Sequence, residues 1–216
     1  MDRTSSQIPA RIRLTGRALN ATVARAPWLW PVLRAPMRRF FDGLADDWDT
    51  GRADSVEHMQ PLASAVTWVS PEPERILDLG TGTGLAALFL AREFPRASVR
   101  GVDISEEMIA QAQRKVGLDP TGRVAFKVAD AAHLPYSDDS FDLVAQLNMP
   151  PFFAETARVL RPGGFVVIAA SSGPATPFYT PESVLERGFR RRGIEAVESG
   201  TAGVGTWFVG RSRAHG

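Results

Sequence analysis

The run of residues best suited to bind a ligand is Arg75–Leu85, in which an apolar stretch leads into a glycine-rich turn. Gly80, Gly82 and Gly84 alternate with other residues in that turn. Glycine lacks a Cβ atom, so it permits positive φ angles and lets the backbone approach a ligand closely. Asp78 precedes the turn and could anchor an amino group or order the loop. This pattern is compatible with nucleotide binding and also with a merely tight strand-to-helix turn, so its context must decide.

Two further carboxylates follow at the ends of apolar runs. Asp103 comes about 20 residues after the loop, where dinucleotide-type folds hold ribose hydroxyls. Asp103 could instead cap the next helix, although Ser105 is better placed for capping. Asp130 ends the following run and could accept a hydrogen bond from an adenine amino group. Because open α/β sheets bind ligands at the carboxyl ends of their strands, we expect these groups to converge.

The segments that must position these residues alternate between β-branched runs and helical patterns. This alternation predicts a parallel sheet with crossover helices. Ser105 is expected to cap the second of these helices, with acidic residues in its first turn and basic residues in its last. Two closing strands could pair as a hairpin. The expected elements are 75–79, 85–94, 98–102, 106–116, 123–129, 141–147, 152–160, 165–170, 181–192, 194–199 and 206–211.

The N-terminal part is interpreted as a separate helical segment or lid comprising residues 1–53, followed by a ligand-binding domain comprising residues 54–216. A helix is predicted over Arg11–Ala24, followed by a proline-bounded turn over Pro27–Pro31. A second helix is predicted over Ser55–Val69, despite a proline within it. The expected buried positions of the two helices are Ile12, Leu14, Leu19 and Val23, and Val56, Met59, Leu62 and Val66.

Composition restricts the classes of function. The chain has 25 basic and 24 acidic residues, so no global field attracts nucleic acid. It has no cysteine, which excludes disulfides, thiolate metal sites and thiol nucleophiles and is typical of a reducing cytoplasm. The apolar stretch Ala26–Leu33 is far shorter than the roughly 20 residues that span a bilayer. We therefore expect a cytoplasmic protein with no transmembrane segment and no metal.

Several motifs, taken in order, resemble those of the class I S-adenosylmethionine-dependent methyltransferases, especially the ubiquinone and menaquinone biosynthesis group. The resemblance implies an α/β, Rossmann-like, doubly wound, seven-stranded, mostly parallel sheet with an antiparallel final strand. It also implies S-adenosylmethionine as cofactor and S-adenosylhomocysteine as product. The motifs are Asp78–Gly84, Gly101–Ser105, Asp130 with Leu134-Pro135-Tyr136, Phe141–Val144 and Arg158–Gly164.

The resemblance also implies a set of cofactor contacts. It places Asp78 and the glycines near the methionine moiety, Asp103 on the ribose, and Asp130 with Ala131 beside adenine. The stretch Phe41–Asp49 resembles the element that precedes the domain in this group, so Trp48 is expected to line the site. The expected cofactor-binding residues are Trp48, Asp78, Gly80, Thr81, Gly82, Gly84, Asp103, Ile104, Asp130 and Ala131.

The acceptor is expected to be a small molecule, but two departures hinder the transfer of acceptor contacts. The link from Val144 to Arg158 is short, and Asn148–Phe152 replaces a longer polar segment. That segment also resembles the Asn-Pro-Pro-aromatic motif of methyltransferases acting on planar nitrogens, although Met149 interrupts it. The loop Pro174–Thr180 could build acceptor specificity, or could simply lead into a helix capped by Thr180.

Methyl transfer by in-line displacement depends mainly on alignment and exclusion of water, so a base is optional. If the acceptor is a hydroxyl, the candidate bases are His58, His133 and Tyr179. None of them is assigned a catalytic role.

Other functions remain open at this point. The arginine-rich N-terminus with Trp28 and Trp30 could contact a membrane surface or an acidic partner, or form a packed lid. The same region could clamp phosphates in a nucleic-acid methyltransferase. A nicotinamide oxidoreductase is disfavoured because Leu85 occupies the third glycine position of that fingerprint. A silent scaffold that binds the cofactor without turnover is the remaining alternative.

Overall fold

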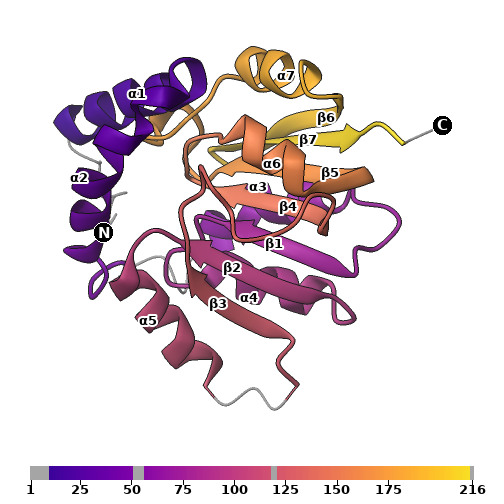
Figure 1. Ribbon diagram of the computed structural model, residues 1–216, viewed down its shortest axis with the longest axis horizontal. Coiled ribbons are helices and arrows are strands. Elements are labelled where there is room, and N and C mark those ends of the chain that lie inside the picture. The colour runs from indigo at the N-terminus through magenta and orange to yellow at the C-terminus, as the bar shows by residue number, and fades with distance from the viewer. Residues whose placement is uncertain (1–9, 51–55, 118–120, 215–216) are drawn as a thin grey trace.

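The computed structural model describes residues 10–50, 56–117 and 121–214. Its centre is a seven-stranded sheet in the order β3-β2-β1-β4-β5-β7-β6 (Figure 1). β7 is antiparallel to both of its neighbours, β5 and β6, while the other neighbouring pairs are parallel. The sheet therefore confirms the predicted fold. The strands are β1 Arg75–Leu79, β2 Ser98–Asp103, β3 Val124–Val128, β4 Phe141–Leu147, β5 Leu160–Ala170, β6 Ile194–Ala202 and β7 Gly205–Ser212.

Alternation along the central strands gives the sheet two apolar faces. On β1, Ile76 packs with α3 (Val56–Val66) and α4 (Leu85–Glu93). Its neighbour Leu77 packs on the other face, with α6 (Phe153–Val159) and α7 (Glu182–Arg190). Successive side chains of a strand point to opposite faces, so consecutive apolar residues such as Ile76 and Leu77 serve both layers. The loops that follow β1, β2, β3 and β4 lie at the carboxyl edge of the sheet.

The helix after β2, α5 (Glu106–Val116), begins as predicted. The Ser105 hydroxyl accepts a hydrogen bond from the Met108 backbone N–H at 3.1 Å. Glu106 and Glu107 lie in the first turn, and Arg114 and Lys115 in the last, so both ends complement the helix dipole. This cap fixes where β2 ends and therefore where Asp103 lies.

The N-terminal segment is more helical than predicted. After α1 (Ala10–Arg25) and the short helix η1 (Pro27–Leu29), the chain forms a further helix, α2 (Trp30–Asp42). Sequence patterning indicated only a turn here, because of its prolines. Pro31 lies in the first turn of α2, where no N–H is needed, and Pro36 lies on the exposed side. The helix α2 packs against α5, whereas α1 lies farther along, toward α7 (Figure 1).

Two expected core positions are wrong. Leu14 is 67% exposed and Val56, the first residue of α3, is 77% exposed, so neither side chain faces the core. Leu19, Val23, Leu62 and Val66 are buried as expected, and Met59 packs partly against the core. The side chain of Ile12 and the structure of Ser55 lie outside the described residues.

β5 begins five residues earlier than predicted. Phe141 pairs with Leu160 and Leu143 pairs with Phe165, so Arg161–Gly164 bulge out of the register. Gly163, with φ of 78°, permits this bulge. The closing strands β6 and β7 form the predicted hairpin. The helix α7 starts after Pro181, and no side chain caps it, so the predicted Thr180 cap is wrong.

Candidate functional site

The glycine loop turns sharply between β1 and α4. Gly80, Gly82 and Gly84 have φ angles of 74°, 53° and 86°, which favour glycine. A Cβ on Gly80 would lie 2.5 Å from the Met149 sulfur, and one on Gly82 would lie 3.3 Å from Nε1 of Trp48. These two glycines therefore bring the backbone against residues of a cavity. A Cβ on Gly84 would instead meet the Phe126 ring at 2.7 Å, so Gly84 makes room for core packing.

Asp78 lies buried beneath this loop. Its Oδ2 accepts a hydrogen bond from the Thr81 hydroxyl at 2.5 Å, while its Oδ1 is buried with no partner among the described residues. Burial is the main cause that raises the pKa of Asp78 from 3.8 to about 7. A buried acceptor without a donor is costly, so this oxygen is suited to receive a donor from a ligand.

Asp103 ends β2 beside the loop. Its Oδ2 accepts from the Gly82 backbone N–H at 2.9 Å, and its Oδ1 accepts from the Ser105 N–H at 2.9 Å. Burial raises the pKa of Asp103 above its usual value. Each carboxylate oxygen has further lone-pair capacity, so the group can order the loop and still accept from a ligand hydroxyl. Ser105, and not Asp103, caps α5.

A cavity of about 120 Å³ lies at this edge of the sheet. Seven of the ten residues predicted to bind the cofactor line it, and Asp78, Gly84 and Asp130 do not. The helix α2 contributes Trp30, Met37 and Phe41, which the sequence did not single out as site residues. The predicted residues in the lining are Trp48, Gly80, Thr81, Gly82, Asp103, Ile104 and Ala131.

The Asp130 carboxylate contacts the helix α2. Its Oδ1 accepts from the Trp30 indole N–H at 2.7 Å and from the Ala132 N–H at 2.9 Å. Arg34 approaches its Oδ2 at 3.8 Å. Trp30 is buried and packs edge-on against Phe152, with ring centroids 5.0 Å apart. The structure thus gives Asp130 an anchoring role for α2, which the sequence did not indicate.

The acidic stretch after α2 ties the N-terminal segment to the edge of the sheet that carries the glycine loop. The Ser105 hydroxyl donates to Asp42 Oδ1 at 2.6 Å, beside the start of α5. Asp49 accepts from the Thr83 hydroxyl at 2.5 Å, within the glycine loop, and forms an ion pair with Lys115. Trp48 lies between these contacts and packs edge-on against Phe41. The segment after α2 therefore links the glycine loop to α5.

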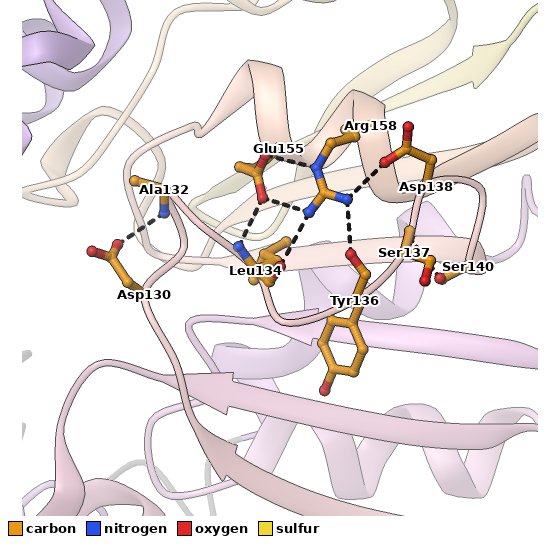
Figure 2. A network of polar contacts seen from close by, with 9 residues as sticks. All are labelled: Asp130, Ala132, Leu134, Tyr136, Ser137, Asp138, Ser140, Glu155 and Arg158. Atoms are coloured by element: carbon orange, nitrogen blue, oxygen red, sulfur yellow. Dashed lines mark hydrogen bonds and ion pairs between the residues drawn. The ribbon is translucent and has the colours of Figure 1, made fainter.

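The loop after Asp130 is held by an arginine (Figure 2). The Arg158 guanidinium makes two hydrogen bonds to Glu155, of 2.7 and 2.8 Å, and one to Asp138 of 2.8 Å. It also donates to the carbonyl oxygens of Leu134 and Tyr136, at 3.1 and 2.8 Å. The Arg158 hydrogen bond is the main cause that lowers the pKa of Glu155. This network fixes the segment that follows Asp130 and Ala131.

Asn148 joins the ends of β4 and β5 and lines the cavity. Its φ is 57°, and its Oδ1 accepts from the Ser171 N–H at 2.8 Å. Of the three candidate bases, His58 lines this cavity, whereas Tyr179 lines a neighbouring one and His133 is exposed. Within the described residues, no cluster of His, Asp or Glu is arranged to hold a metal ion. No helix in those ranges is both long and apolar enough to span a bilayer.

The part of the chain that carries this site is similar to known methyltransferases. Residues 76–164 match the family model described as methyltransferase domain. The chain is 37% identical over 143 residues to malonyl-[acyl-carrier protein] O-methyltransferase of Geobacter sulfurreducens, covering 63% of this chain and 53% of the relative. It is also 37% identical over 117 residues to the ubiquinone/menaquinone biosynthesis C-methyltransferase UbiE of that organism, covering 50% and 46%. The chain thus spans about half the length of these curated relatives.

A solved structure has the same fold. Magnesium protoporphyrin IX methyltransferase of Synechocystis PCC 6803, solved with bound S-adenosylmethionine, matches with a TM-score of 0.66 and 21% identity, covering 83% of this chain and 96% of that one. The matched family domain contains the glycine loop and Asp103, which meet at one sheet edge. Residues 76–164 therefore carry a methyltransferase domain of the class I S-adenosylmethionine-dependent type, whose cofactor is S-adenosylmethionine.

Proposed function

We propose that this chain transfers the methyl group of S-adenosylmethionine to a small-molecule acceptor. The observation that carries the proposal is the convergence of the glycine loop and Asp103 on one cavity, above the unpartnered Asp78 Oδ1. The names of the relatives, which act on quinone precursors and on a carrier-bound malonyl group, support acceptors of this kind.

The chain's own residues can bind and orient the cofactor, which supplies an electrophilic methyl group on a sulfonium. Asp103 would accept from the ribose hydroxyls with the lone pairs that Gly82 and Ser105 leave unused. Asp78 Oδ1 would accept from the amino group of the methionine moiety. Ala131 would lie beside adenine, where Asp130 Oδ2 remains able to accept. The positions of these carboxylates and of the backbone beside them support each role.

Acceleration would come from alignment and from exclusion of water. The cavity is lined by Met37, Phe41 and Trp48 from the lid side and by Met149 and Phe152 from the sheet side. Apolar walls of this kind remove water from the path of a displacement. His58 is the one predicted base that lines the cavity, and the proposal does not require it to move a proton.

Turnover distinguishes this proposal from the silent-scaffold alternative. The purified chain is incubated with S-adenosylmethionine and mixtures of phenols, amines and short oligonucleotides, and S-adenosylhomocysteine is quantified by mass spectrometry. Product formed with small molecules, and lost in Asp103→Ala, supports the proposal. Product formed only with oligonucleotides, or tight cofactor binding with no product in any mixture, overturns it.

We also propose that the turn between α1 and α2, comprising η1 and the start of α2, contacts an anionic membrane surface. Trp28 and Val32 are each 73% exposed, and Leu29 between them is also exposed. Residues 10–41 hold seven arginines and no acidic residue. Exposed tryptophan and aliphatic side chains among arginines suit the boundary between lipid headgroups and acyl chains. An anionic bilayer complements both the charge and the apolar tip.

A further inference from the structure

A second cavity, of about 230 Å³, adjoins the cofactor cavity. Met149 and Phe178 line both cavities and so form the boundary between them. Met149 also packs against Gly80 of the cofactor loop. A molecule in the second cavity would therefore approach the cofactor past these two side chains.

One face of three neighbouring strands forms the floor of this cavity. The strands are β5, β7 and β6, which together span about 10 Å across the sheet at the usual strand spacing. The β5 side of the floor, nearest to Met149, is apolar, and the β6 side carries hydroxyls. The register places two rows on this face: Ile168 with Phe208 and Ser199, and Ala170 with Thr206 and Thr201.

The polar end of the cavity has unused hydrogen-bonding capacity. The Ser199 hydroxyl donates to Glu182 Oε1 at 2.6 Å, and Glu182 lies in the first turn of α7. Within the described ranges, Glu182 Oε2 and the hydroxyls of Thr201 and Thr206 have no hydrogen-bond partner. Among the residues that the structure describes, no arginine or lysine lines the cavity. This end would accept hydrogen bonds and would repel an anion.

We infer that this second cavity binds the methyl acceptor, and that the acceptor is a small molecule with a flat apolar body and a neutral or cationic hydrogen-donating group at the end remote from the methylated atom. The inference rests on the proposed methyl transfer. An apolar cavity of about 150 Å³ accommodates benzene, so this volume holds a substituted ring. The apolar body lies over Ile168 and Phe208, its reactive end faces Met149, and its donor reaches Glu182.

Three probes with one ring and different side-chain charges test the inference: tyramine, tyrosol and 3-(4-hydroxyphenyl)propanoate. Each is titrated calorimetrically into the protein saturated with S-adenosylhomocysteine. We expect tyramine to bind most tightly and the propanoate most weakly. In Glu182→Gln, tyramine should bind about fivefold more weakly, since the pair is partly exposed to solvent. Tyrosol should change less than about twofold, because glutamine still accepts a hydrogen bond.

Glu186→Gln is the matched control, one helical turn along α7 and outside the cavity lining. It should leave all three affinities as in the wild type. The inference is overturned if the propanoate binds as tightly as tyramine, if Glu182→Gln leaves the affinity for tyramine unchanged, or if none of the probes binds the loaded protein. Failure of the wild type to bind S-adenosylhomocysteine would overturn the proposed function instead, so the two failures are distinguishable.

Discussion

The buried Asp78 carboxyl, which we propose binds the cofactor, should lower the free energy of unfolding when it is ionised. Its pKa is raised from 3.8 to about 7, mainly by burial. Between these values the folded state holds a proton that the unfolded state has released, so the free energy of unfolding falls as pH rises through this window. Above about pH 7 the full destabilisation is present, and the rise from 3.8 to about 7 corresponds to about 4 kcal/mol.

Asp78→Asn removes this charge while keeping the shape of the side chain. The Thr81 hydroxyl can still donate to the amide oxygen, but the amide NH₂ then lies where Oδ1 has no partner. An unpaired buried donor costs about 1–3 kcal/mol. We therefore expect the variant to be about 2 kcal/mol more stable than the wild type at pH 8, and of similar stability at pH 5. Its affinity for S-adenosylmethionine should fall at least tenfold.

Urea unfolding at the two pH values measures this difference directly. The control is Asp139→Asn, which removes an exposed carboxylate at a residue with φ of 56°, a conformation that asparagine tolerates. That control should differ equally from the wild type at both pH values. A wild type that is more stable than Asp78→Asn at pH 8, or a difference that does not change with pH, would refute the reasoning.

Three further predictions follow from single contacts. Asp103→Ala should weaken S-adenosylmethionine binding about 10- to 100-fold by titration calorimetry, because a charge-assisted hydrogen bond is lost; unchanged affinity in a folded variant would remove Asp103 from the site. Arg158→Met should lower the free energy of unfolding by about 1–2 kcal/mol in urea, because Glu155 loses its bidentate partner; an unchanged midpoint would contradict this. Val32→Ser should weaken co-sedimentation with phosphatidylglycerol vesicles about fivefold. The control Val204→Ser changes a valine that is 76% exposed on the β6–β7 turn, and it should leave vesicle binding unchanged. Equal effects of the two substitutions would argue against a membrane contact at the turn between α1 and α2.

The central strands and their ligand-bearing ends were predictable because the signals are local. The spacing of Gly80 and Gly82 reflects backbone conformations that few other residues adopt, and the structure has positive φ at both. Ser105 caps α5 as its position before two glutamates indicated. The alternation of strands and helices predicted that Asp78, Asp103 and Asp130 lie near the carboxyl ends of neighbouring strands, and they do.

Features that depend on distant contacts were not predictable. The Trp30 indole meets Asp130 across 100 residues of sequence, and no local pattern links them. The helix α2 was missed because a turn was predicted over Pro27–Pro31, whereas Pro31 lies in the first helical turn. Pro36, farther along the helix, faces solvent. Arg158 was noted only as part of a motif, although it holds the segment around Tyr136. The one signal that could have indicated this role is the i, i+3 spacing of Glu155 and Arg158 on one helix.

Titration calorimetry of the purified chain with S-adenosylmethionine, S-adenosylhomocysteine and NADH tests the central claim most directly. The site predicts saturable one-to-one binding of the first two ligands, weakened in parallel by Asp103→Ala, and no binding of NADH. Absence of binding to a protein that unfolds cooperatively in urea, or binding of NADH at the same site, would contradict the assignment of this cavity to S-adenosylmethionine.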